Sequence, residues 1–299
     1  MSSGIPNTTN PRPTNASGWL TIPAPLARLF KKFPLLTYPP NELPARSPNV
    51  RDVATLYVFI SDQDALKGLP SFNPSCLKWQ AFLKLAGVDF RLVSSNNHAS
   101  PTGALPFLIP PSSNPATLAP VPSYELEQYA IEKGMYKIPD ISSPKLEVYE
   151  SLLDHQLRNG WLYSLYLSPS NTALLSHLYI APVSSSRVVR ATILHQLRHA
   201  AETEILKSMG TPAVNAVVIY DEAGLAINAL STALNSDRWF FGAPVPTLFD
   251  AAVFSYTHLL LDDRLPWKDQ KLPNMMKRCQ NLVDHRNRIL QKCWGIKAS

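Results

Sequence analysis

The sequence has 299 residues, enough to bury a sizeable core and to divide into two domains. Its hydrophobic share of 45% is that of a globular protein, and no window of about 20 residues is free of charged and turn-forming residues, so we expect no transmembrane helix. The net charge of +6 comes without a recognised nucleic-acid-binding motif, which argues against nucleic acid as a partner. The three cysteines form neither a CxxC pair nor a disulfide framework, which favours a reducing, cytosol-facing compartment.

The first 51 residues form a distinct segment. They are rich in Pro, Ser, Thr and Asn, carry a net charge of +5 and lack sustained periodicity, so we expect an extended Pro-rich arm. The shortage of acidic residues is also typical of a transit peptide, but the prolines argue against the amphipathic helix that such a peptide needs. Within the arm, a short apolar and basic patch is the candidate partner-binding surface: Trp19, Leu20, Leu29, Phe30, Lys31, Lys32 and Phe33.

The next part of the chain predicts a strand–helix–strand unit. β-branched and aromatic residues at 56–60 indicate a strand, and Asn73 and Pro74 supply the cap and first residue of a helix that reaches Ala86. Alternating residues at 89–94 indicate a second strand, which such a crossover places parallel to the first. A third strand is expected at 105–109, followed by a Pro-rich loop at 110–122 and a helix at 124–133 that Ser123 caps.

Beyond residue 140 the pattern predicts only helices. Apolar residues recur three and four positions apart over 146–167, 186–209 and 222–234, and further helices are expected over 247–261 and 271–293. We therefore expect a basic arm (1–51), an α/β domain (52–140) and an all-helical domain (141–299).

The start of the helix at 247–261 carries a first resemblance. It follows a segment of aromatic residues, a glycine turn and a proline-rich hinge, and Thr247 and Asp250 stand at the spacing of a capping box. This combination resembles the helical domain of glutathione-transferase-like proteins. The resemblance implies a thioredoxin-like α/β first half and an all-α second half. Since that first half has a cis proline before its third strand, the Leu105–Pro106 bond is predicted to be cis.

The residues that a glutathione transferase uses on its substrate are not in place. Such an enzyme needs a Tyr, Ser or Cys just after the first strand, where residues 61–72 offer only Ser61 and Ser71. It also needs a Glu-Ser-like pair before its third helix, whereas Glu125 follows Ser123 here, which places its carboxylate on another face. The sequence therefore predicts that the glutathione site is lost and that no cofactor is bound.

Cys76 is the strongest candidate for enzymatic chemistry. If Asn73 caps the helix, Cys76 occupies the third helical position, where the helix dipole could lower the pKa of the thiol. Free cysteines are more often buried in a core, and the apolar pattern around Cys76 favours that structural role.

Two other clusters are weaker candidates. His195 and His199 have a spacing that can bind zinc, but no third ligand is apparent and Gln196 stands where the metalloprotease motif needs Glu. Asp262 and Asp263 would work as an acid–base pair only inside a pocket, and a solvated turn is the simpler interpretation.

Basic segments lie at both ends of the sequence. Residues 264–299 carry a net charge of +7, so the middle of the chain is acidic. This distribution suggests contact with an acidic protein face or an anionic membrane surface. The plainer interpretation is a solvated final helix whose cations complement its dipole.

Several ordered motifs carry a narrower resemblance. Gly68-Leu-Pro-Ser-Phe-Asn-Pro-Ser-Cys-Leu77 opens the first long helix, and Ser100-Pro-Thr-Gly-Ala-Leu-Pro106 precedes the third strand. With Phe240-Phe-Gly242 and the box of Thr247 and Asp250, they resemble the metaxin family over roughly residues 56–262. Cys76 matches a family position with no assigned catalysis, so the resemblance gives Cys76, like Pro106, Thr247 and Asp250, a structural role.

The resemblance implies a non-enzymatic subunit of the mitochondrial sorting and assembly machinery, which inserts β-barrel precursors into the outer membrane. Because no extra C-terminal sequence or anchor is apparent, it implies the smaller, peripheral subunit on the cytosolic face. The implied partners are the membrane β-barrel core subunit, a second and larger metaxin-like subunit, the β-signal of the precursor and the outer-membrane surface. The alternative is a cytosolic glutathione-dependent transferase or thiol enzyme that uses Cys76.

Overall fold

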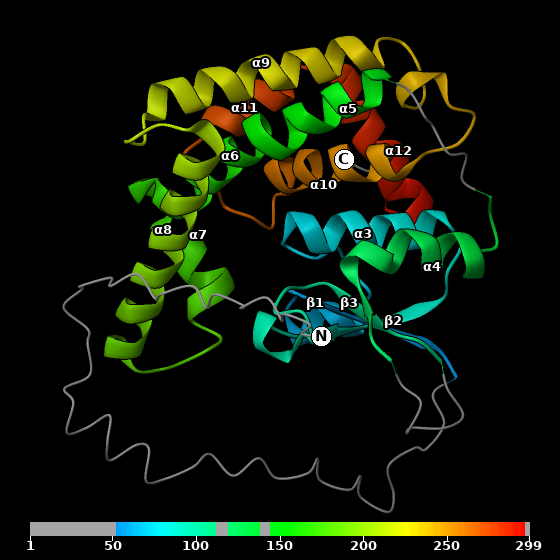
Figure 1. Cartoon of the computed structure of the whole chain (residues 1–299), viewed down its shortest axis with the longest axis horizontal. Helices are drawn as coiled ribbons and strands as arrows, with labels where there is room; N and C mark the ends of the chain where they lie inside the picture. The colour runs from blue at the N-terminus through cyan, green and yellow to red at the C-terminus, as the bar shows by residue number, and fades with distance from the viewer. Residues whose placement is uncertain (1–51, 112–118, 138–143, 297–299) are drawn as a thin grey trace, which may run out of the picture. The chain divides into compact units, whose positions relative to one another are not determined.

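The computed structural model describes residues 52–111, 119–137 and 144–296. The expected domain boundary at 140–141 lies outside these ranges. So does the whole candidate patch of the arm: Trp19, Leu20, Leu29, Phe30, Lys31, Lys32 and Phe33. In the described part of the chain, α3 and α4 cover a small sheet, and most helices of the second half lie beyond α3 (Figure 1).

The sheet has the strand order β2-β1-β3-β4. Its strands are β1 (Ala54–Val58), β2 (Phe90–Ser94), β3 (Phe107–Ile109) and β4 (Val121–Pro122). β1 pairs with β2 in parallel and with β3 in antiparallel, which confirms the predicted crossover unit. The Leu105–Pro106 bond is cis, as predicted. β3 is shorter than expected and starts at Phe107, because Pro106 has no N–H for the ladder.

The crossover helix α3 (Pro74–Leu85) forms as the sequence indicates. The Asn73 side chain accepts a hydrogen bond from the backbone N–H of Cys76 at 3.1 Å, and Gly87 follows the helix with φ +75°. Burying Gln80 on this helix is possible because both ends of its amide are hydrogen-bonded: the oxygen accepts from the N–H of Ser71 at 2.9 Å, and the nitrogen donates to the carbonyl of Leu69 at 2.8 Å.

Two local features of this half differ from the sequence analysis. The segment after β1 contains a short helix, α2 (Asp62–Leu66), which we did not predict; the Ser61 hydroxyl caps it. Ser123 makes no capping hydrogen bond; it begins a 3-10 turn, η3 (Ser123–Glu125), and α4 (Leu126–Lys133) starts after that turn. A 3-10 turn η1 (Asn97–Ala99) follows β2.

The helical half begins with one long run. α5 (Pro144–Ser151) continues through the π-type turns η4 (Leu152–Leu157) and η5 (Tyr163–Leu167), with α6 (Arg158–Leu162) between them. The sequence did not predict the next short elements, η6 (Pro169–Asn171), α7 (Thr172–Leu175) and η7 (Ser176–Ile180). The later helices are α8 (Arg187–Met209), α9 (Ala216–Leu234), η8 (Phe240–Gly242), α10 (Leu248–Leu261), α11 (Lys271–Lys277) and α12 (Gln280–Trp294).

The expected single helix over 271–293 is two helices. The chain leaves helical geometry at Cys279, where ψ is 81°. At the start of α12 the Asn281 side chain donates to the carbonyls of Ser231 at 2.8 Å and Asn235 at 3.0 Å. These bonds hold the start of α12 against the end of α9, so the break places α12 where one continuous helix would not lie.

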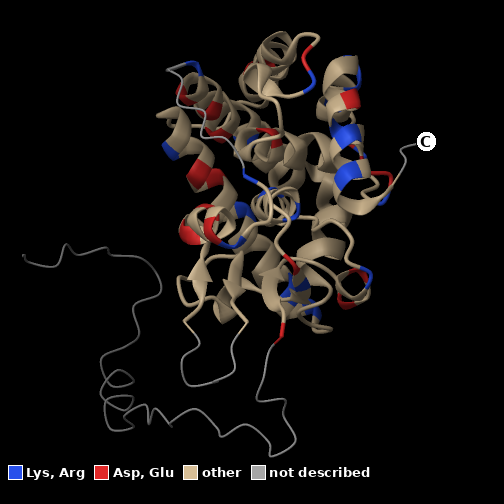
Figure 2. Ribbon diagram, turned by 90° about the vertical axis from the view of Figure 1, so that its right-hand side faces the viewer, with Lys and Arg blue, Asp and Glu red and all other residues tan. Residues whose placement is uncertain are grey.

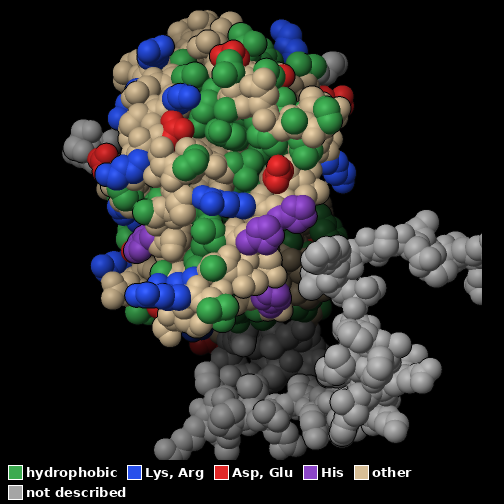
Figure 3. Space-filling model, turned by 90° about the vertical axis from the view of Figure 1, so that its left-hand side faces the viewer, with side chains coloured by type: hydrophobic (Ala, Val, Ile, Leu, Met, Phe, Trp, Pro, Cys, Tyr) green, Lys and Arg blue, Asp and Glu red, His purple; other side chains and the backbone are tan. Residues whose placement is uncertain are grey.

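Helix α9 bears on the expectation that the chain has no transmembrane helix. By length and composition it is the one described helix that could cross a membrane, although we expected none. Its inner face, which includes Ile219, Ala223 and Ile227, is buried, as in a core helix of the same composition. Its outer face exposes Val217 and Leu225. Figure 3 looks at the side of the molecule that lies at the left of Figure 1, where one end of α9 is found. Apolar side chains gather on the upper part of this side.

Candidate functional site

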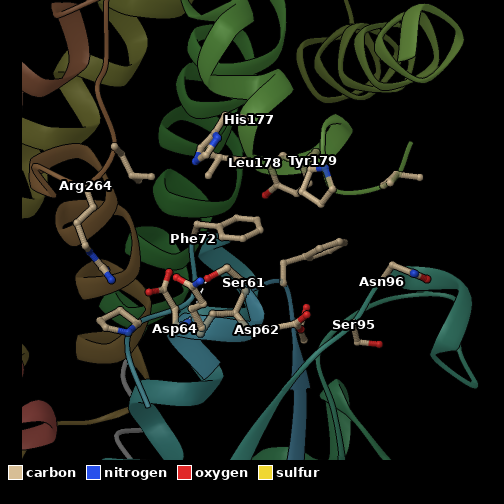
Figure 4. A pocket seen from close by; sticks show the side chains of 18 of the residues that line it. Ser61, Asp62, Asp64, Phe72, Ser95, Asn96, His177, Leu178, Tyr179 and Arg264 are labelled. Carbon is tan, nitrogen blue, oxygen red and sulfur yellow. Dashed lines mark hydrogen bonds between the residues drawn. The ribbon is translucent and has the colours of Figure 1, made fainter. Parts of the chain in front are cut away.

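A cleft of about 930 Å³ opens beyond the end of β1. Five segments line it: the β1–α2 turn and the start of α2, the residues before α3, the end of β2 with the residues that follow it, the end of η7 with the residues after it, and the turn after α10. In Figure 4, His177, Leu178 and Tyr179 lie across the cleft from Asp62 and Asp64, with Arg264 on one side and Ser95 and Asn96 on the other. Its volume suits a ligand larger than a single amino acid.

One wall of the cleft is aromatic. Tyr179 stands edge-on to Phe59 and Phe72, with ring centroids 5.3 and 5.2 Å away. The Tyr179 hydroxyl accepts a hydrogen bond from the Asn73 side chain at 3.1 Å. Burial raises the pKa of Tyr179 well above its ordinary value, so this hydroxyl stays protonated and is poorly suited to activate a thiol.

The charged groups of the cleft are mainly carboxylates. Asp62 and Asp64 lie in the first turn of α2, and in the described part of the chain neither takes part in an ion pair. Asp262 is held by Arg264, whose guanidinium donates to both carboxylate oxygens at 2.7 to 3.1 Å. Burial raises the pKa of Asp262, but the hydrogen bonds and charge of Arg264 outweigh it and keep that pKa below its ordinary value.

The hydroxyl groups of Ser61 and Ser71, the candidates near β1, both make hydrogen bonds that stabilise the local backbone. Ser61 accepts a hydrogen bond from the N–H of Asp64 at 3.1 Å and caps α2. Ser71 is fully buried and donates to the carbonyl of Phe59 at 2.6 Å. Ser123 and Glu125, the residues of the second glutathione contact, lie in η3 and do not line the cleft.

Cys76 has the structural environment that its apolar neighbours indicate. Its side chain is fully buried, and burial raises the pKa of the thiol to about 12 despite hydrogen bonding with Phe59 and Ser71. Loss of hydration outweighs any lowering of the pKa by the helix dipole. Such a thiol is not a nucleophile at neutral pH.

Thr247 and Asp250 form the predicted capping box at the start of α10. The Asp250 carboxylate accepts from the N–H and hydroxyl of Thr247, both at 2.8 Å, and from the N–H of Phe240 at 3.0 Å. His285 of α12 adds a contact the sequence did not indicate: its Nε2 lies 2.8 Å from Asp250, with both side chains fully buried. The box is thus a buried polar centre that joins three segments.

The two remaining candidate pairs, His195 with His199 and Asp262 with Asp263, do not form the sites that their spacing allowed. The rings of His195 and His199 stack at 6.4 Å, and the described residues contain no group of three side chains suited to hold a metal. Asp262 lines the cleft, but Asp263 does not. The cleft residues of η7 were missed because no capping or turn signal marks that segment. The short spacing of Asp262 and Arg264 was the available signal for their pairing.

Two family models agree with this architecture. The model of the Glutathione S-transferase N-terminal domain matches residues 74–171, and that of the Glutathione S-transferase C-terminal domain matches residues 223–289. The glutathione transferase GSTFuA3 of Phanerochaete chrysosporium is 12% identical, with a TM-score of 0.46, covering 77% of this chain and 97% of that one.

Curated relatives narrow the family. A Metaxin-1 homolog of Caenorhabditis briggsae is 28% identical over 223 residues, which is 72% of this chain and 67% of the relative. Metaxin-1 of Macaca fascicularis is 25% identical over 75% of this chain and 71% of its own length. A Drosophila melanogaster Metaxin-1 homolog is 39% identical over 71 residues, 24% of this chain and 21% of the relative. The chain therefore belongs to the metaxin family of proteins with a glutathione-transferase-like fold.

Proposed function

We propose that this protein is a non-enzymatic subunit of the sorting and assembly machinery of the mitochondrial outer membrane. In this proposal it is the smaller metaxin-like subunit, lies peripherally on the cytosolic face and helps deliver β-barrel precursors to the membrane β-barrel core subunit. Its likeness to metaxin-1 proteins supports the assignment at the level of the family.

The observation that carries the proposal is the state of the cleft beside β1. A thiol-transferring enzyme needs an available hydroxyl or thiolate there, and a site for the anionic ends of glutathione. Ser71 and Cys76 are fully buried, and Ser61 caps α2. The cation of Arg264 is taken by Asp262, so the cleft offers uncompensated carboxylates to an anionic substrate.

The basic end of the sequence supports a peripheral position only in part. Lys and Arg line α12 (Figure 2). Arg286 donates to the carbonyl of Leu261 at 3.4 Å, and Arg288 donates to that of Arg238 at 3.0 Å, so these cations also serve the fold. We expect the membrane association to depend mainly on the other subunits.

Co-purification from digitonin-solubilised mitochondria tests the proposal. A tagged chain should recover a membrane β-barrel protein and a second metaxin-like subunit. Carbonate should extract the tagged chain, and protease added to intact mitochondria should degrade it. Recovery of a soluble monomer with no membrane fraction would argue against the proposal.

The transferase alternative makes the opposite prediction in a separate assay. It requires retention on immobilised glutathione and thiol-transfer activity that is lost in Cys76→Ala. Because Cys76 is fully buried, we expect neither.

A further inference from the structure

The cleft beside β1 combines an aromatic wall with carboxylates on the opposite side. Phe59, Phe72 and Tyr179 present ring surface that is partly exposed to the cleft, and Val183 at its rim is 63% exposed. An apolar side chain gains free energy by covering such a surface. The face of an aromatic ring also attracts a nearby cation.

The charged side chains of the cleft favour a positively charged ligand. Asp62 is exposed and Asp64 is half-buried, and both line the cleft without an ion-pair partner among the described residues. In the described part of the chain, the one Lys or Arg side chain that lines the cleft is Arg264, which Asp262 neutralises at 2.7 Å. A cationic ligand therefore meets a favourable potential, whereas an anionic one meets repulsion.

The size of the cleft indicates a chain segment. About 930 Å³ is far more than one Lys or Arg side chain occupies, and the lining residues come from five separate segments that leave it open to solvent. A ligand that places apolar and cationic side chains side by side satisfies both walls at once. An extended, amphipathic polypeptide has this chemistry.

We propose that this cleft is a docking site for an extended polypeptide segment of a partner protein in which Lys or Arg alternates with aromatic or aliphatic residues. The cationic groups face Asp62 and Asp64, and the apolar side chains cover Phe59, Phe72 and Tyr179. This inference deepens the proposed function and rests on it only for the identity of the partner protein. Peptide binding itself is measured on the purified protein alone. Co-purification and peptide binding therefore fail independently.

Fluorescence anisotropy with defined peptides tests the site. The probe is a labelled nonapeptide of alternating Lys and Phe; the comparison peptide has Glu in place of each Lys. We expect the Lys peptide to bind and to weaken as salt rises from 50 to 300 mM. In Asp62→Asn/Asp64→Asn its affinity should fall about tenfold, since partly exposed ion pairs each contribute modestly. The Glu peptide and glutathione should not compete.

A matched variant separates the cleft from net charge. Glu125→Gln/Glu127→Gln changes the charge equally, and both residues are exposed acids at the start of α4, outside the cleft. It should bind the Lys peptide like the parent protein. Phe72→Ala should also weaken binding, with circular dichroism confirming that it is folded. Equal affinity of the parent and the Asp62→Asn/Asp64→Asn variant, or equal binding of the Glu peptide, would overturn the proposal.

Discussion

Asp250 accepts hydrogen bonds with both of its carboxylate oxygens while fully buried. The donors are the N–H of Phe240, the N–H and hydroxyl of Thr247, and Nε2 of His285, since a carboxylate can only accept. Buried charge is tolerated only where such partners replace water. This residue therefore matters to stability more than an ordinary capping residue does.

Replacing Asp250 with Asn should strongly destabilise the protein. One oxygen becomes an NH₂ group that faces an N–H donor, leaving buried donors without an acceptor, at a cost of about 3 kcal/mol or more. Urea unfolding followed by circular dichroism measures this loss. Asp237→Asn, at an exposed position, is the matched control and should change stability little. Equal effects of the two substitutions would show that the buried network is unimportant.

His258 is a buried imidazole that should make the fold acid-sensitive. Burial lowers its pKa from 6.5 to about 3; Asp262 opposes this shift, and Arg286 and Arg264 add to it. Its Nε2 lies 3.5 Å from Asp262, and at neutral pH the ring is uncharged, so the contact is not an ion pair. Below pH 6.5 the unfolded chain binds a proton that the folded chain takes up only near pH 3. The free energy of unfolding should therefore decrease as the pH is lowered through this window, by up to about 1.4 kcal/mol per pH unit.

The variant His258→Phe tests this pH dependence. Phenylalanine preserves the stacking on Phe254, where the ring centroids are 5.3 Å apart, but binds no proton. We expect its urea midpoint to fall less than that of the parent between pH 7 and pH 4. His98→Phe, at an exposed position, controls for the loss of an imidazole. Parallel profiles for the parent and His258→Phe would contradict the prediction.

At the level of elements, α6 and α9 approach closely because Gly160 has no side chain. A Cβ added there would lie 2.7 Å from the Cβ of Ala223, whereas one added at Gly224 would meet the flexible Met275 side chain at 3.4 Å. Two glycines on the contacting helices thus differ in the room around them. The helices cannot simply separate, since α9 also packs against α11 and α12.

The substitution Gly160→Ala should therefore cost about 1 to 3 kcal/mol through overpacking. Gly224→Ala is its matched control and should be neutral or slightly stabilising, because Ala favours a helix over Gly by up to about 1 kcal/mol. Thermal unfolding of both variants measures the difference. If Gly160→Ala melted no lower than Gly224→Ala, close packing of α6 on α9 would not limit stability.

Local signals were enough to predict the start of two long helices. Asn73 and Pro74 mark the start of α3, and Thr247 and Asp250 mark that of α10; both caps form. The break at Cys279 depends on the bonds of Asn281 to α9, which are distant in sequence. The cleft was missed for the same reason, since Tyr179 and Asp262 meet Asp62 only in the folded chain.

Over the whole described molecule, α12 joins the helical half to the α/β half. The indole N–H of Trp294 donates to the carbonyl of Gly68 at 2.9 Å, and its ring stacks on Phe254 with centroids 5.6 Å apart. Lys84 of α3 lies over the same ring at 5.5 Å. Since α3 also packs along α10, we expect the two halves to unfold together.

Graded replacement of Trp294 tests that coupling. Trp294→Phe loses the hydrogen bond but keeps an aromatic ring, and should cost about 1 kcal/mol; Trp294→Ala should cost about 3 kcal/mol. Hydrogen exchange should become faster in β1 and α3 as well as in α12. Faster exchange confined to α12 would show that the halves are independent.

The position of Trp294 has a consequence during synthesis. The strands and α3 are made well before α12, so the α/β half lacks its contacts with Trp294 until α12 has been made. Until then, the apolar surface that α12 will cover is open to chaperones and to aggregation. We expect the α/β half to reach its full stability only after α12 has been made.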